Sequence, residues 1–152
     1  MIDIKWTLDE EEGIDPIDPL GDITLTDGRT SLSVESTYLD SWFSAFITGI
    51  KAVKSGHRAT VEVAEEPDIL IFEPWESGML LSYQNSALRV KQIEEFLEIF
   101  RHAAHQFLSQ VDNQTGCDRN PLLNLIRDFL EAEKITAVSA LALTTNKSIC
   151  VR

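Results

Sequence analysis

Two histidines and a glutamate are spaced so that they fall on one side of a helix. His102 and His105 are three residues apart, and Glu98 comes four residues before His102. Imidazole and carboxylate groups at such spacings are able to share a metal ion. Neither the Glu-x-x-His pairing of di-iron bundles nor the H-E-x-x-H of zinc proteases is present, however. We therefore expect a solvated helix surface here and predict no metal site.

The densest charge in the chain is an acidic cluster close to the N-terminus. Its candidate partner-binding members are Asp9, Glu10, Glu11, Glu12, Asp15 and Asp18, and Asp22 follows. The cluster does not fit a calcium loop, because Leu20 occupies the place where an EF-hand needs its last carboxylate. Two interpretations stay open: a solvated loop, and a surface that binds a basic partner.

The net charge of the chain is −12, and most of it lies in the N-terminal 40 residues. Residues 1–40 carry eleven carboxylates against Lys5 and Arg29, a balance of −9, which leaves −3 for the rest of the chain. No basic stripe is present that would neutralise phosphates, so the charge argues against nucleic acid and anionic membranes as partners. Basic proteins remain candidate partners, and a homo-oligomer is left open.

Three further features are weaker candidates. Glu65 and Glu66 would form an acid and base pair if one were buried, but adjacent carboxylates between strands are more often turn residues. Trp75 follows a strand and either packs against the sheet edge or serves as a partner anchor. Cys117 and Cys150 are too far apart in sequence for a zinc motif, and they fit a reducing compartment.

No motif for a catalytic nucleophile or a phosphate-binding glycine loop is present, so we predict no catalytic residue and no cofactor. The N-terminal residues lack the pattern of a signal peptide, and no apolar run approaches the roughly 20 residues that span a bilayer. The prediction is a cytoplasmic protein.

Hydrophobic periodicity predicts a single α+β domain over residues 1–152, with a loose acidic loop at about residues 9–22. A hairpin is expected around Asp27-Gly28, between strands at 23–26 and 30–34. The other expected strands are 2–6, 59–63, 69–72, 79–83 and 87–90. We expect one antiparallel sheet of about five to seven strands, packed against two or three amphipathic helices.

The helices are expected where apolar residues recur every three or four positions. The first is predicted from Ser36 as N-cap to a stop near Gly56, and the second covers 91–111. The third begins at Asn120-Pro121 and ends around Lys134. Residues 135–143 suit either a helix or a strand; we favour a strand, followed by another at 148–151.

Part of the chain resembles a group of small bacterial proteins of uncharacterised function. The resemblance covers about residues 36–111 and rests on Leu39 to Phe46 with Trp42, on Gly49 and Gly56, and on Glu65-Glu66-Pro67 with Phe72. In that group a tryptophan-bearing helix precedes a strand meander with an E-E-P step. Some similar proteins are immunity or accessory partners of bacterial toxins, which implies a binding role and no catalytic residues.

Two functional hypotheses follow. The first is a cytoplasmic protein-binding module, of the immunity type, that uses its acidic residues and Trp75 against a basic partner. The alternative is a small enzyme or ligand-binding protein whose site lies between sheet and helices, from residues such as His57, Glu65 and Tyr83. Whether the chain is an enzyme is left open, and a protein without catalytic activity is the favoured interpretation.

Overall fold

The structure is a computed structural model that describes residues 2–11, 13–112 and 119–139, with side chains to residue 133 in the last helix. Seven strands and three helices lie in these residues. The strands are β1 (Asp3–Leu8), β2 (Leu20–Thr26), β3 (Ser31–Tyr38), β4 (Ala59–Glu62), β5 (Ile69–Trp75), β6 (Gly78–Tyr83) and β7 (Ser86–Val90). The helices are α1 (Leu39–Lys54), α2 (Ile93–Val111) and α3 (Pro121–Ser139).

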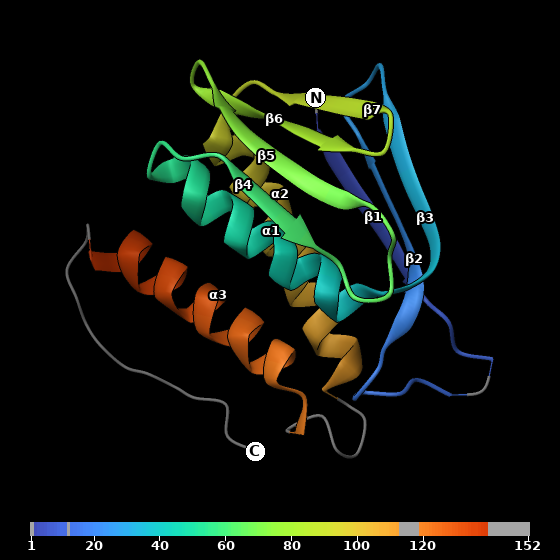
Figure 1. The fold of residues 1–152 in the computed structure, drawn as a ribbon. Helices are drawn as coiled ribbons and strands as arrows, with labels where there is room; N and C mark the ends of the chain where they lie inside the picture. The colour runs from blue at the N-terminus through green and yellow to red at the C-terminus, as the bar shows by residue number, and fades with distance from the viewer. Residues whose placement is uncertain (1, 12, 113–118, 140–152) are drawn as a thin grey trace.

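The predicted α+β class is confirmed, but the strands form two antiparallel sheets instead of one. The first sheet has the order β1-β2-β3 and the second the order β4-β5-β6-β7. Helix α1 separates β3 from β4 in the chain, so no hairpin joins the two meanders. Figure 1 shows both sheets lying over α1 and α2, with α3 packed against α1 on the side away from β4 and β5.

One aromatic core serves both sheets and the helices. Phe46 of α1 has its ring centroid 6.4 Å from that of Phe72 on β5 and 6.0 Å from those of Phe96 and Phe100 on α2. Phe43 stacks on Phe107 of α2 at 4.8 Å. All of these rings are fully buried. The space between the second sheet and the helices is therefore filled by side chains.

The close approach of α1 to β5 depends on a glycine. A Cβ atom added at Gly49 would lie 2.3 Å from the Phe72 ring, inside any normal contact distance. The absence of a side chain at this position lets the helix backbone sit directly on the ring.

The predicted hairpin at Asp27-Gly28 is confirmed, and Asp27 does more than shape its turn. One carboxylate oxygen accepts hydrogen bonds from the N–H groups of Arg29 and Thr30, both at 2.8 Å. The other accepts one from the N–H of Arg89 on β7, at 3.0 Å. Burial raises the pKa of Asp27, but these hydrogen bonds outweigh it, and the net pKa is lowered. The turn of the first sheet is thus tied to the edge of the second.

Two expected boundaries were wrong. Helix α3 continues to Ser139, so no strand begins at residue 135. Each residue added to an existing helix gains a hydrogen bond without a new nucleation cost, which favours continuation through this Ala- and Val-containing stretch. The remaining tail positions, 140–143 and 148–151, are outside the described residues. Ser36 is not the cap of α1, because the helix begins at Leu39 and Ser36 has a φ of 51°.

Candidate functional site

The acidic loop between β1 and β2 is shorter than expected and is fixed to the body of the protein. Strand β2 begins at Leu20, so residues 20–22 of the expected loop belong to the sheet. Pro16 and Pro19 are buried, and Ile14 packs against the core. The loop, which leaves the end of β1 in Figure 1, is therefore not loose in its second half, although its described acidic residues are exposed.

Asn120 is the residue that fastens this loop. Its side-chain amide donates hydrogen bonds to the carbonyls of Pro16 and Ile17, at 3.0 and 3.1 Å, and to the Asp40 carboxylate at 2.8 Å. Its oxygen accepts from the N–H groups of Leu122 and Leu123, which confirms its predicted role as the N-cap of α3. With an exposed fraction of 3%, Asn120 joins the loop, α1 and α3 at one buried point.

Asp40 is the buried acid at this junction. Burial raises its pKa, and the negative charge of Asp18 acts in the same direction. Hydrogen bonds from Asn120 and from the N–H of Ser41 act against burial and favour the charged form. The carboxylate is 5% exposed and belongs to the support of the loop.

The described carboxylates of the loop itself are exposed, and no described cation compensates them. Asp9, Glu10, Glu11, Asp15 and Asp18 form no salt bridge with any residue that the structure describes, while Glu12 is outside the described part. Asp9 and Asp15 each accept one local backbone hydrogen bond, from Glu11 and Ile17. The described part of the loop therefore presents negative charge that no described cation pairs with, and its second half is held in place by Asn120.

Trp75 does not join this acidic surface. It is the last residue of β5, and Figure 1 places the β5–β6 turn at the opposite end of the molecule from residues 9–19. The guanidinium of Arg89 lies over its ring, 3.8 Å from the centroid, and the side chain is half-buried. This contact gives Trp75 a packing role within the second sheet.

A polar network inside the fold was missed by sequence reasoning. The Thr37 hydroxyl donates to Glu66 at 2.7 Å and accepts from the indole N–H of Trp42 at 2.8 Å. The hydroxyl of Tyr83 donates to the same carboxylate at 3.4 Å. Glu66 thereby links β3 to β6, and Thr37 extends the network to Trp42 of α1. In the sequence, the E-E-P step was the only sign of this network.

The site suggested from His57, Glu65 and Tyr83 is not assembled. His57 precedes β4 and Glu65 follows it, so the two lie at opposite ends of that strand. Both are exposed, and Tyr83 instead meets Glu66. Burial raises the pKa of Tyr83 to about 12, together with the charges of Glu66 and Asp68. A tyrosine that keeps its proton so firmly is poorly suited to act as a base near neutral pH.

Replacing Glu66 by glutamine should lower the pKa of Tyr83 from about 12 toward its ordinary value of 10.0, because one charge is removed while burial remains. Tyr38 is the other tyrosine, so the titration is best followed in a Tyr38→Phe background by phenolate absorbance. Circular dichroism at each pH would show that the fold persists. An unchanged Tyr83 pKa in the glutamine variant would contradict the network.

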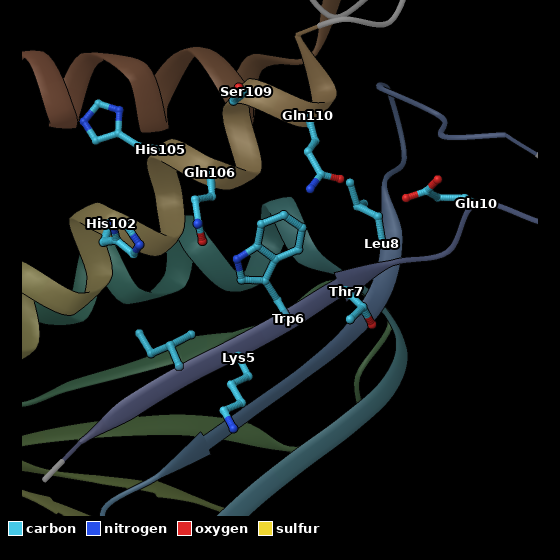
Figure 2. A pocket seen from close by; sticks show the side chains of 11 residues that line it. Lys5, Trp6, Thr7, Leu8, Glu10, His102, His105, Gln106, Ser109 and Gln110 are labelled. Atoms are coloured by element: carbon cyan, nitrogen blue, oxygen red, sulfur yellow. The ribbon is translucent and has the colours of Figure 1, made fainter.

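His102 and His105 are exposed on α2, as expected for a solvated helix face. Glu98 pairs with Arg101 at 2.8 Å. No group of three metal-ligating side chains occurs in the part of the chain that the structure describes. The two histidines instead line one wall of an open groove of about 870 Å³, whose other wall is β1 (Figure 2).

Comparison with known proteins gives no match: no family, no curated protein and no solved structure is significantly similar to this chain. Among the described residues, no helix is long and apolar enough to cross a membrane.

Proposed function

We propose that this protein is a binding module for a basic protein partner, of the immunity type that the sequence resembles, and that it acts in the cytoplasm. The acidic loop between β1 and β2 is the recognition surface. The observation that carries the proposal is the anchoring of this loop by Asn120, since the buried amide bonds the carbonyls of Pro16 and Ile17.

Anchoring matters because binding by a disordered acidic tail must first order that tail, at a cost in free energy. Here the fold has already fixed half of the loop through Asn120 and two buried prolines. The exposed carboxylates of that half, Asp15 and Asp18, then act as a preorganised part of the surface. Complementary charge of this kind speeds association and selects against acidic partners.

The alternative, an enzyme or ligand-binding site between sheet and helices, is less well supported. The rings of Phe46, Phe72 and Phe96 occupy that space and are fully buried. The hydroxyl of Tyr83 is taken up by its hydrogen bond to Glu66. The acidic loop between β1 and β2 is therefore the better candidate for the functional site.

The proposal predicts that the immobilised protein captures a basic partner in a salt-dependent manner. Capture from a lysate of the source cells at about 50 mM and about 500 mM salt should recover a protein of high isoelectric point at the lower salt, with at least about tenfold less at the higher one. An unrelated domain of equal net charge serves as control, because it measures simple ion exchange. Equal recovery on that control, or no basic protein above background, would overturn the proposal.

A further inference from the structure

The groove lies beside the outer edge of β1, and no strand among the described residues pairs with that edge. Strand β1 pairs with β2 on one side, and it is the outer strand of its sheet. The N–H of Asp9 donates to the carbonyl of Leu20 at 2.9 Å, which fixes the phase of the ladder. In an antiparallel pair every second residue turns its N–H and C=O away from the partner strand. Ile4, Trp6 and Leu8 therefore present their backbone groups at the outer edge.

The opposite wall of the groove is polar and comes from α2. Its side chains are His102, His105, Gln106, Ser109 and Gln110, and all of them are exposed. Figure 2 shows Gln106 pointing toward Trp6, whose ring stands between β1 and the helix. That ring contacts Phe107 edge to face at 5.7 Å, so the floor of the groove is apolar and fixed. An edge strand facing a helix is an arrangement that accepts a peptide as an added strand.

The charges around the groove indicate what occupies it. Glu10 lines one end, next to Asp9 and Glu11 of the acidic loop. Lys5 is the cation of β1 and is one of the residues that line the groove, and Figure 2 shows its side chain directed away from α2. A segment that lies along β1 thus meets histidine, glutamine and serine side chains of α2 over most of its length, and negative charge beyond Leu8.

We propose that an extended segment of the basic partner adds to β1 as a fourth, antiparallel strand of the first sheet and carries a Lys or Arg near its own N-terminal end, against Glu10. This inference rests on the proposed function and assigns the place where the partner's chain is held. Strand β1 has six residues, about 20 Å at about 3.3 Å per residue, which sets the length of the segment.

A second copy of the protein is a poorer occupant. Each copy carries a net charge of −12, and pairing two β1 edges would bring two acidic loops onto the same sheet. Like charges repel, so two copies that each carry this negative charge oppose one another's approach. A partner of opposite charge meets no such barrier.

The test needs no identified partner. A displayed library of random peptides of about eight residues is selected on the wild-type protein and on two variants. Gln106→Trp fills the groove, and Thr48→Trp places the same side chain at an exposed position of α1 as a matched control. Peptides with an early Lys or Arg should be enriched on the wild type and on Thr48→Trp, and lost at least about tenfold on Gln106→Trp.

Hydrogen exchange then locates the bound peptide. The amides of Ile4, Trp6 and Leu8 should exchange faster than those of Lys5 and Thr7 in the isolated monomer, and slow by at least about tenfold with a selected peptide bound. Three results would each overturn the inference. The first is equal binding of peptides to both tryptophan variants, and the second is protection of these amides in the isolated monomer. The third is a dimer that Gln106→Trp abolishes. If Gln106→Trp still captures the basic protein in a salt-dependent manner, the proposed function stands and the groove is wrong.

Discussion

Replacing Asn120 by alanine should lower the free energy of unfolding by about 3–4 kcal/mol, as judged from urea denaturation. Loss of the cap on Leu122 and Leu123 costs about 1 kcal/mol, and leaving a buried carboxylate without its donor costs about 2–3 kcal/mol. Asn120→Asp is the informative second variant. It keeps the capping oxygen but sets a second negative charge against Asp40, so it should be no more stable than the alanine variant.

The cost of Asn120→Ala should depend on pH with a definite sign. Burial already raises the pKa of Asp40, and the lost hydrogen bond had opposed that shift, so the pKa rises further in the variant. A raised folded-state pKa means that stability is lost as pH rises through it. The destabilisation should therefore be larger at about pH 7 than at about pH 4. If the difference in stability between the wild type and Asn120→Ala did not change with pH, the Asn120 amide would have no effect on the pKa of Asp40.

Replacing Phe46 by alanine should cost about 3–5 kcal/mol, because its ring is central to the shared core. It contacts rings of both the second sheet and α2, so the cavity left behind cannot collapse onto one neighbour. Phe129→Ala is the control. Phe129 has an exposed fraction of 6% and one aromatic partner, Phe100, so its loss should cost at least about 1 kcal/mol less. Equal costs would argue against a single core centred on Phe46.

Local sequence signals predicted the elements of this fold well. The Asp27-Gly28 turn, the stop of α1 at Gly56 and the Asn120-Pro121 start of α3 are each confirmed, because each depends on the backbone chemistry of one or two residues. The separation into two sheets was not predictable in this way. Strand pairing depends on how α1 crosses between the two meanders, and no local pattern specifies that crossing.

The candidate site shows the same limit. The acidic residues were evident in the sequence, but Asn120, which fixes the second half of their loop, lies more than a hundred positions away from Pro16. The capping role of Asn120 was predicted from its place before Pro121. Its side-chain amide, however, donates hydrogen bonds to the acidic loop and to α1, and no local pattern indicates that these segments meet. Glu66 stood out in the sequence only as the neighbour of Glu65. Its hydrogen-bond partners, Thr37 and Tyr83, could not be predicted from the sequence.

The most direct test of the binding surface is to remove the charge of the loop while keeping its shape. The variant carries D9N, E10Q, E11Q, D15N and D18N, in which the Asn side chains retain the oxygens that accept the hydrogen bonds of Glu11 and Ile17. A matched control neutralises five exposed acids elsewhere: Glu35, Glu62, Glu76, Glu94 and Asp128. Both variants have the same net charge.

The measurement is the amount of basic partner captured at low salt by the wild type and by each variant. If the loop is the recognition surface, its neutralisation should reduce capture by at least about tenfold, while the control retains most of it. Equal capture by the two variants would mean that net charge alone attracts the partner and would contradict the assignment of the acidic loop.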